Sequence, residues 1–226
     1  MRDVLDVLQR AQLVVFDFDG TLVDSNPIKH RAFAECFMEF PEQLDDILEY
    51  CWGHHHVPRG EKFRYVYETI LQRAYTSAVA AALHERFDVA TTRQIIAAPE
   101  IPGATDVLRA VSQRYTTALL SSTPQEMLVY IVEQRGWSGY FKRIQGAPVD
   151  KKAWLRTAQT IQALEGTQVV FFGDTQEDET AAIAAGCRFI RVGGSANGAM
   201  AAQGIWSMSD FTSLLPLFSE PMPSER

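Results

Sequence analysis

Two aspartates separated by one residue, Asp17 and Asp19, directly follow the apolar run at 13–16. That run is β-branched and aromatic, which predicts a buried strand. Because side chains alternate along a strand, Asp17 and Asp19 are expected to leave it on roughly one side. Two carboxylates at a buried strand end are unfavourable unless a cation or a proton offsets their charge. Ligands also bind at the carboxyl ends of strands in open α/β sheets. The pair therefore predicts a divalent-metal and phosphoryl site, with Gly20 letting the backbone turn.

Taken alone, the Asp-Gly step at 19–20 also suits an ordinary turn or a helix cap. Motifs elsewhere in the chain must therefore distinguish these structural roles from a metal site.

A second acidic pair supports the metal site. The apolar run at 168–172 ends in Gly173-Asp174, and Asp178 follows four residues after Asp174. Carboxylate oxygens at strand ends suit Mg²⁺, which also keeps waters and substrate phosphate as ligands. Glu177 is equally explained as a favourable charge at the start of a helix.

A third apolar run, at 115–121, ends in hydroxyl side chains. Ser121 and Ser122 come just before Pro124, where a helix is expected to begin. Ser121 and the neighbouring backbone N–H groups can donate hydrogen bonds to phosphate oxygens. A simple N-cap for the following helix is the alternative, but a strand end that accompanies two acidic strand ends favours the phosphate site.

Two adjacent lysines, Lys151 and Lys152, stand at the start of a predicted helix. An ammonium group there can neutralise a nucleophilic carboxylate and a phosphate, which otherwise repel each other. The register relative to Leu155 favours Lys151, while Lys152 stays open. The other lysine of the pair is expected to be a solvated charge.

The elements that must position these groups alternate between strand and helix after about residue 98. Such alternation predicts a parallel sheet with helices on both faces, a Rossmann-like α/β core. Further strands are predicted at 142–145, 189–192 and 205–206, and helices at 103–113, 124–135, 150–164, 176–185 and 210–218.

The segment between the first strand and residue 98 is different, because it contains one helical pattern after another and no convincing strand. Helices are expected from Asn26, from Pro41 and from Pro58, followed by alanine-rich helical sequence at 77–87 and 88–98. We therefore expect a discontinuous core domain of residues 1–24 and 98–226, interrupted by an all-helical cap domain of residues 25–97.

Composition limits the partners. The chain of 226 residues is 46% hydrophobic and 22% charged, with a net charge of -7. This acidic balance argues against nucleic acid or an anionic membrane as the main partner, and no apolar run approaches the ~20 residues of a membrane span. Its three scattered cysteines indicate reduced thiols in a cytoplasmic protein.

The motifs, taken in order, resemble the signatures of the haloacid dehalogenase superfamily. The run ending in DxDGT at 17–21, the strand-end Ser121, the helix-start lysine and GDxxxD at 173–178 followed by AAIAAG occur at suitable separations. A helical insert between the first and second signatures resembles the helical-cap members, such as the phosphoglycolate phosphatases and β-phosphoglucomutases. The family often has Lys-Pro where this chain has Lys151-Lys152, so this chain departs from the family pattern at this position.

The resemblance implies a small-molecule phosphatase that requires Mg²⁺ and forms an aspartyl-phosphate. Asp17 would be the nucleophile and Asp19 the general acid/base; family dehalogenases lack the second aspartate. The metal would be held by Asp17, the Asp19 carbonyl and Asp174, with Asp178 binding directly or through water. Ser121, Lys151, Ser122 and the backbone at Gly20 would complete the phosphate site.

Other activities remain open at this point. A phosphomutase of the same superfamily would use the same residues, and a non-catalytic binding protein on this scaffold is disfavoured because the acids, the serine and a lysine are present. A phosphonate hydrolase would need a lysine in the cap, and Lys29 and Lys62 are candidates.

The basic cap segment at 53–64 offers candidates for substrate specificity. Arg59 and Lys62 could grip a second polar or anionic part of the substrate, although a solvated helix face is slightly favoured. Histidines 54–56 suit a single metal ion poorly, because adjacent side chains point in different directions.

Overall fold

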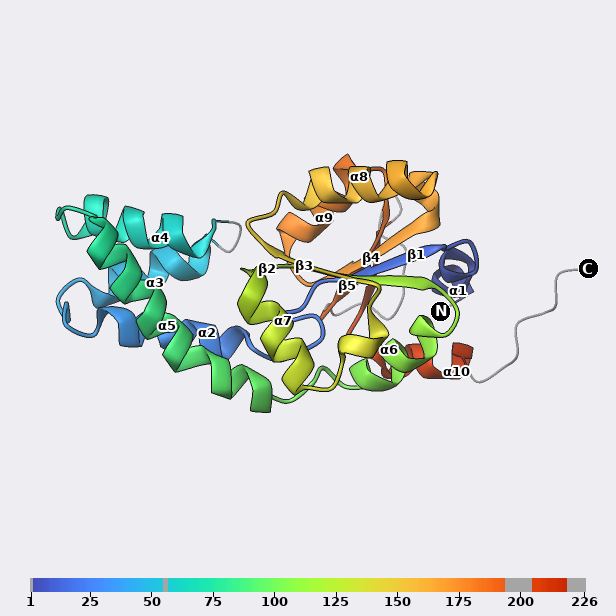
Figure 1. Cartoon of the computed structure of the whole chain (residues 1–226), viewed down its shortest axis with the longest axis horizontal. Coiled ribbons are helices and arrows are strands. Elements are labelled where there is room, and N and C mark those ends of the chain that lie inside the picture. Colours follow the sequence, from blue (N-terminus) through green and yellow to red (C-terminus); the bar gives the residue numbers. More distant parts are fainter. Residues whose placement is uncertain (1, 55–56, 194–204, 219–226) are drawn as a thin grey trace, which may run out of the picture. The chain divides into compact units, whose positions relative to one another are not determined.

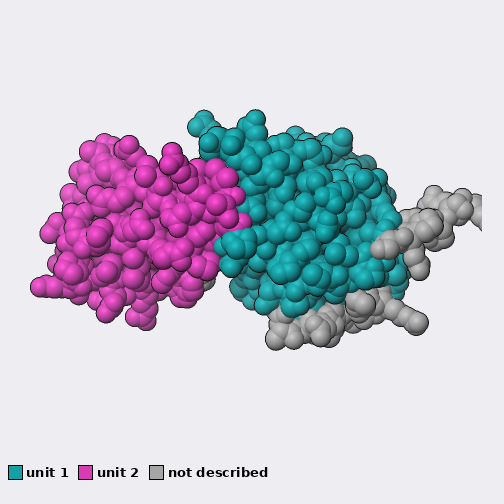
Figure 2. All heavy atoms as spheres, turned by 90° about the horizontal axis from the view of Figure 1, so that it is seen from below, with its two compact units in different colours: residues 1–24, 99–226 teal, residues 25–98 magenta. Residues whose placement is uncertain are grey.

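The computed structural model describes residues 2–54, 57–193 and 205–218. The chain divides into two compact units, one of residues 1–24 and 99–226 and the other of residues 25–98 (Figure 2). The second unit ends at Ala98, one residue later than we expected. Ala98 is buried, and its N–H donates to the carbonyl of Ile95 and so closes the preceding helix.

The first unit is built on a parallel sheet, as predicted from the alternation of strands and helices (Figure 1). Its described strands have the order β3-β2-β1-β4-β5-β6, so the strand order reverses between β1 and β4. Such a reversal creates a crevice at the carboxyl ends of the two strands, where ligands bind in doubly wound sheets. The strands are β1 (Leu13–Phe16), β2 (Thr116–Pro124), β3 (Arg143–Ala147), β4 (Val169–Gly173), β5 (Arg188–Val192) and β6 (Ile205–Met208).

Helices cover both faces of this sheet, which confirms the predicted fold class (Figure 1). The bounds of the longer helices are α1 (Arg2–Gln9), α6 (Ala104–Ser112), α7 (Gln125–Gln134), α8 (Lys151–Gln162) and α9 (Gln176–Ala184). Short helical segments complete the unit: η2 (Ser138–Tyr140), η3 (Gly166–Gln168), η4 (Phe211–Leu214) and α10 (Leu215–Phe218).

Alternation along the strands separates the two faces. Leu13 and Val15 of β1 join one buried cluster with apolar side chains of α8 and α9. Phe16 points to the other face, where its ring stacks on Phe172 of β4 at 5.0 Å between centroids and also contacts Phe211. Because successive side chains alternate, the residue after Phe16 returns to the face covered by α8 and α9.

Strand β2 is longer than the sequence predicted, because it continues past Ser121 to Pro124. The extension depends on a distant pairing, in which Pro124 lies opposite Ala147 of β3 after a shift in register. The last predicted helix is likewise divided into the 3₁₀ turn η4 and the short helix α10.

The described residues of the second unit form helices joined by turns and loops, with no strand among them. Its elements are α2 (Asn26–Phe37), α3 (Leu44–Gly53), α4 (Arg59–Tyr65), the π-helical turn η1 (Val66–Ile70) and α5 (Ser77–Ala97). Phenylalanines 33, 37, 63 and 87 form the centre of its core.

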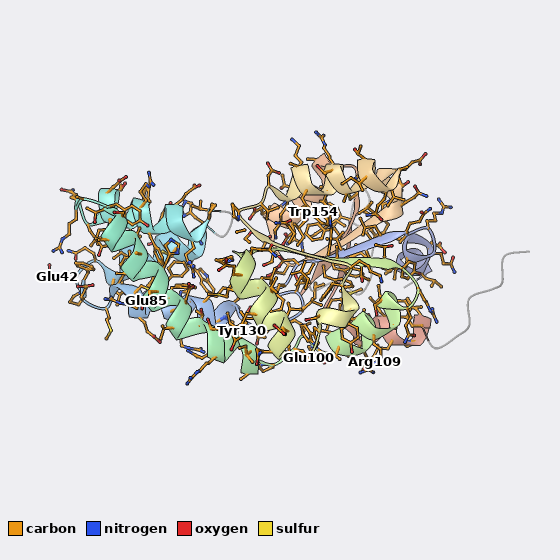
Figure 3. All side chains as sticks on the ribbon, in the orientation of Figure 1. Glu42, Glu85, Glu100, Arg109, Tyr130 and Trp154 are labelled. Atoms are coloured by element: carbon orange, nitrogen blue, oxygen red, sulfur yellow. The ribbon has the colours of Figure 1, made fainter. Side chains whose placement is uncertain are left out.

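Three helices of this unit differ from the prediction. Helix α3 begins at Leu44 and not at Pro41, because residues 41–43 form a turn. The sequence suggested a break near residue 88, but α5 continues for 21 residues. Leu83, Phe87, Thr91 and Ile95 recur every fourth residue and bury one continuous face, while Glu85 projects from the exposed side (Figure 3). The helix expected from Pro58 is α4, which ends at Tyr65 and passes into the π-helical turn η1, after which Gln72 adopts a positive φ of 52°.

Among the described residues, no helix combines the length and apolarity needed to cross a bilayer. Cys36, Cys51 and Cys187 are all buried free thiols.

Candidate active site

A buried ion-pair network lies at the carboxyl end of β1. The ammonium nitrogen of Lys151 lies 2.9 Å from Oδ1 of Asp17 and 2.6 Å from Oδ1 of Asp178. All three side chains are almost closed to solvent, with exposed fractions of 6% for Asp17, 5% for Lys151 and 0% for Asp178. Lys152 is exposed, so the structure places Lys151, and not its neighbour, in the site.

The local sequence explains how the three groups meet. Asp17 continues the alternation of Leu13 and Val15 toward the face covered by α8 and α9, and its N–H bonds to the carbonyl of Phe172 at 2.8 Å. Helix α8 begins at Lys151 because Asp150 caps it, with its carboxylate accepting from the N–H of Ala153 at 2.8 Å. The first residue of α8 is thereby brought to the end of β1.

Asp178 is held by the start of α9. It forms a capping box with Thr175, whose hydroxyl donates to Oδ2 of Asp178 at 2.6 Å while the N–H of Asp178 donates back to that hydroxyl at 3.2 Å. One carboxylate oxygen therefore belongs to the helix cap and the other to Lys151. Because both of its carboxylate oxygens have hydrogen-bond partners, Asp178 can be fully buried.

The electrostatics of the network favour an additional cation. Burial raises the pKa of Asp17 well above its ordinary value; Lys151 opposes this shift, and the neighbouring carboxylates of Asp178, Asp174 and Asp19 add to it. Burial alone would lower the pKa of Lys151, but Asp17 and Asp178 together raise it. One ammonium among several carboxylates leaves an excess of negative charge that a divalent cation would offset.

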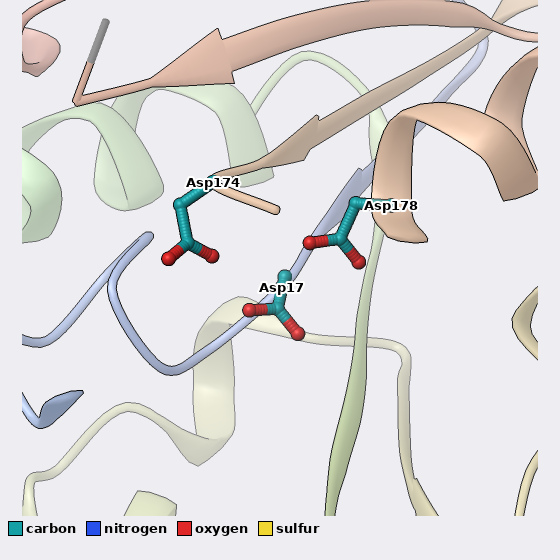
Figure 4. Close-up of side chains that lie close together, drawn as sticks. All are labelled: Asp17, Asp174 and Asp178. Atoms are coloured by element: carbon teal, nitrogen blue, oxygen red, sulfur yellow. The ribbon is translucent and has the colours of Figure 1, made fainter. Parts of the chain in front are cut away.

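Asp174 completes a cluster that could hold that cation. Carboxylate oxygens of Asp17, Asp174 and Asp178 all lie within 4.8 Å of one another, and their side chains converge between β1 and the start of α9 (Figure 4). Thr21 donates to Oδ1 of Asp174 at 3.3 Å, and Arg191 of β5 donates to the backbone carbonyl of Asp174 at 2.8 Å. An all-oxygen donor set of this kind suits Mg²⁺.

Gly173 is required for this close packing. A Cβ atom at residue 173 would lie 2.6 Å from Cβ of Asp178 and 2.9 Å from its Oδ2. Only glycine therefore allows the end of β4 to approach the first turn of α9.

Asp19 contacts the carboxyl end of β2. The hydroxyl of Thr123 donates to Oδ2 of Asp19 at 2.7 Å, and the hydroxyl of Ser121 lies 3.5 Å from the same oxygen. Sequence reasoning missed Thr123, because the strand was expected to end at Ser121. The alternation of side chains could have found it, since residues 121 and 123 share a face while Ser122 is exposed on the other.

The predicted phosphate contacts of Gly20 and Ser122 stay predictions. Gly20 has a positive φ of 76°, and its N–H donates to the carbonyl of Val23 at 2.8 Å. The left-handed conformation explains why glycine occupies this turn.

The cap residues proposed for specificity have partners within the second unit. Arg59 forms an ion pair with Asp88 at 2.6 Å and lies over the ring of Phe87. The ammonium of Lys62 is buried and donates to the carbonyl of Cys51 at 2.9 Å. Their roles in specificity stay predictions.

The described histidine of the 54–56 run, His54, bonds through Nδ1 to the carbonyl of Tyr50 at 2.9 Å. His55 and His56 lie outside the described residues.

Known proteins with similar sequences or folds include phosphoglycolate phosphatases. A phosphoglycolate phosphatase from Pseudomonas fluorescens is 26% identical over 188 residues, which cover 79% of this chain and 68% of the relative. Two solved structures share the fold at low sequence identity. A predicted phosphoglycolate phosphatase from Haemophilus somnus has a TM-score of 0.69 and 20% identity, covering 92% of this chain and 98% of that one. A putative β-phosphoglucomutase from Thermotoga maritima has a TM-score of 0.64 and 21% identity, with the same coverages of 92% and 98%.

The family profile described as haloacid dehalogenase-like hydrolase matches residues 11–186, a span that includes Asp17, Ser121, Lys151 and Asp178. The resemblance to a phosphatase-like member of this superfamily, predicted from the spacing of the motifs, is confirmed. This chain belongs to the haloacid dehalogenase-like hydrolase family.

Proposed function

We propose that this protein is a Mg²⁺-dependent phosphatase that hydrolyses small-molecule phosphomonoesters through an aspartyl-phosphate on Asp17. The observation that carries the proposal is the placement of Asp17. Its carboxylate lies at the end of β1, 2.9 Å from the ammonium of Lys151, and it shares a cluster with Asp174 and Asp178.

The first half-reaction transfers the phosphoryl group to the protein. A carboxylate oxygen of Asp17 forms a bond to phosphorus while the bond from phosphorus to the ester oxygen breaks. Asp19 gives a proton to the departing alcohol. Lys151 holds the Asp17 carboxylate in place and offsets the charge that carboxylate and phosphate bring together.

The second half-reaction returns Asp17 to its starting form. Asp19, now ionised, takes a proton from a water molecule that attacks the phosphorus, and the bond to Asp17 breaks to release inorganic phosphate. The hydroxyl of Ser121 is available as a phosphate ligand beside Asp19.

The donor set fits a bound Mg²⁺. Asp17 and Asp174 would hold it together with the main-chain carbonyl of Asp19, and Asp178 would contribute directly or through water. When bound, the ion supplies positive charge next to the phosphoryl oxygens. The excess of carboxylates over ammonium groups in the cluster supports this assignment.

A small phospho-acid or sugar phosphate is the proposed substrate class, supported by the curated relative named phosphoglycolate phosphatase. The test is phosphate release from a panel of sugar phosphates, nucleotides and small phospho-acids, with and without Mg²⁺. We expect release that depends on Mg²⁺ and is lost in Asp17→Asn. Isomerised sugar phosphate without net phosphate release would instead indicate a phosphomutase, and no turnover of any compound would contradict the proposal.

A further inference from the structure

The end of β2 places a buried hydroxyl group on the residue assigned as general acid/base. Thr123 is 4% exposed, and its Oγ1 donates to Oδ2 of Asp19 at 2.7 Å. Its own N–H donates to the hydroxyl of Ser121 at 3.1 Å, and that hydroxyl lies 3.5 Å from the same carboxylate oxygen. The hydroxyl groups of Ser121 and Thr123 therefore both approach the same carboxylate oxygen of Asp19.

Strand β3 packs closely against the backbone at Thr123. Residue 146 of β3 approaches so closely that a Cβ atom there would lie 2.6 Å from the carbonyl oxygen of Thr123. Gln125, two residues further on, donates to the carbonyl of Ile144 at 3.1 Å. These contacts fix the strand end, so the position of the Thr123 hydroxyl is determined by the sheet and not by a flexible loop.

We propose that Thr123 is a positioning residue that fixes the orientation of the Asp19 carboxyl group for proton transfer to the leaving group. A carboxyl group that accepts a hydrogen bond at Oδ2 keeps its acidic proton on Oδ1, so a single oxygen is presented for proton transfer. During the reaction, the proton moves from Oδ1 to the ester oxygen as the bond from phosphorus to that oxygen breaks. The proton of Thr123 stays on its own Oγ1. This inference rests on the function proposed above, in which Asp19 is the general acid.

The strength of the effect should depend on the leaving group. A weakly basic leaving oxygen departs without much help from a proton, whereas a more basic one needs proton transfer in the transition state. A misplaced Asp19 should therefore slow the hydrolysis of esters with basic leaving groups most. The parameter to follow is kcat/KM, because it reports formation of the aspartyl-phosphate and not its later hydrolysis.

The experiment compares Thr123→Val, which removes the hydroxyl at nearly constant shape, with Thr123→Ser, which keeps it. The matched control is Thr117→Val on the same strand, where a buried threonine hydroxyl donates to the carbonyl of Tyr140 away from the site. Substrates are para-nitrophenyl phosphate, phenyl phosphate and substituted phenyl phosphates of intermediate leaving-group basicity, each with Mg²⁺.

We expect Thr123→Val to lower kcat/KM for phenyl phosphate about 10-fold, a fraction of the full worth of general acid catalysis. The loss for para-nitrophenyl phosphate should be clearly smaller, so the dependence on leaving-group basicity steepens. Thr123→Ser and Thr117→Val should both keep the wild-type dependence. If the valine variant does not fold, Thr123→Ala makes the same comparison.

Equal losses of kcat/KM across the series, or no loss, would overturn the role of Thr123 while leaving the phosphatase intact. A steepened dependence in Thr117→Val would also overturn it, because the effect would then come from general weakening of β2. Absence of phosphate release from every ester by the wild-type protein would instead contradict the proposed function itself, and the role of Thr123 would fall with it.

Discussion

The ammonium group of Lys151 is held 2.6 Å from Oδ1 of Asp178, and both side chains are closed to solvent. Asp178 in turn is fixed by the capping box at the start of α9. Lys151 is therefore anchored on one side by a helix terminus and contacts Asp17 with another of its protons. This arrangement makes the position of the proposed nucleophile depend on the packing of α8 and α9 against the sheet.

Removing this ammonium should damage both stability and activity. Lys151→Ala leaves two buried carboxylates without their counter-charge, a change that typically costs about 3–5 kcal/mol. Lys152→Ala, its exposed neighbour, should change the free energy of unfolding by no more than about 0.5 kcal/mol. Urea unfolding without metal and phosphate release with Mg²⁺ measure the two effects. If Lys152→Ala is the more damaging change in both assays, the assignment of the lysine is wrong.

Because the pKa of Asp17 is raised, its ionisation should lower the free energy of unfolding in a pH-dependent way. When folding raises the pKa of a carboxyl group, the folded protein is most stable below the ordinary pKa of 3.8. The folded state then loses stability as the pH rises from 3.8 through the raised pKa. Asp17→Asn removes this ionisation. In the absence of metal it should be more stable than the wild type near neutral pH, by about 0.5–2 kcal/mol.

The difference should shrink as the pH falls toward about 4, where the wild-type carboxyl group becomes protonated. Urea unfolding across this pH range, with a chelator present, measures it. Added Mg²⁺ should stabilise the wild type more than the variant. If Asp17→Asn is less stable than the wild type at neutral pH without metal, ionised Asp17 does not destabilise the folded protein.

Gly173 should tolerate no side chain. In Gly173→Ala the new methyl group would lie 2.6 Å from Cβ of Asp178 and push that residue away from Lys151. We expect a loss of about 1–3 kcal/mol in stability and of about 10²-fold in phosphate release, since small displacements at a reacting centre are costly. Gly139→Ala is the control, because a Cβ there has no heavy atom within 4 Å. Equal activity of the two variants would contradict the close-packing argument.

Arg191 should affect metal binding without touching the metal. Its guanidinium donates to the backbone carbonyl of Asp174 at 2.8 Å and forms an ion pair with Glu179 of α9. Arg191→Ala should weaken Mg²⁺ binding about 10-fold or more, as loss of groups that support metal ligands commonly does. The measurement is the rise in melting temperature over a Mg²⁺ titration, from which the dissociation constant for Mg²⁺ follows because stabilisation grows as RT ln(1 + [L]/Kd). Arg188→Ala, on the same strand β5 as Arg191, is the control, because the Arg188 guanidinium lies over the ring of Trp206 of β6. Indistinguishable Mg²⁺ responses would remove Arg191 from the site.

Much of the fold was predictable because its signals are local. The apolar runs that end in Asp17 and in Asp174 identify two strand ends of a parallel sheet without any knowledge of packing, and the structure shows that these strands are neighbours. The same holds for the helical insert, where the period of apolar residues is helical throughout.

Features that depend on distant segments were not predictable in the same way. Thr123 was missed because β2 extends beyond Ser121 only through its pairing with β3. The ion pair between Arg59 and Asp88 joins residues on two helices, and neither the spacing nor the composition of the sequence indicates it. The choice between Lys151 and Lys152, by contrast, was favoured correctly by the register relative to Leu155, because both Lys151 and Leu155 lie on the buried face of α8.

If Asp17 carries the phosphoryl group during turnover, the aspartyl-phosphate can be trapped and identified. The protein is mixed with Mg²⁺ and para-nitrophenyl phosphate, quenched in acid within the first turnover, digested and analysed by mass spectrometry. We predict a phosphate adduct on the peptide containing Asp17, and none in Asp17→Asn, which should also release no phosphate. An unmodified Asp17 in a protein that is turning over, together with near wild-type phosphate release by Asp17→Asn, would show that Asp17 is not the nucleophile.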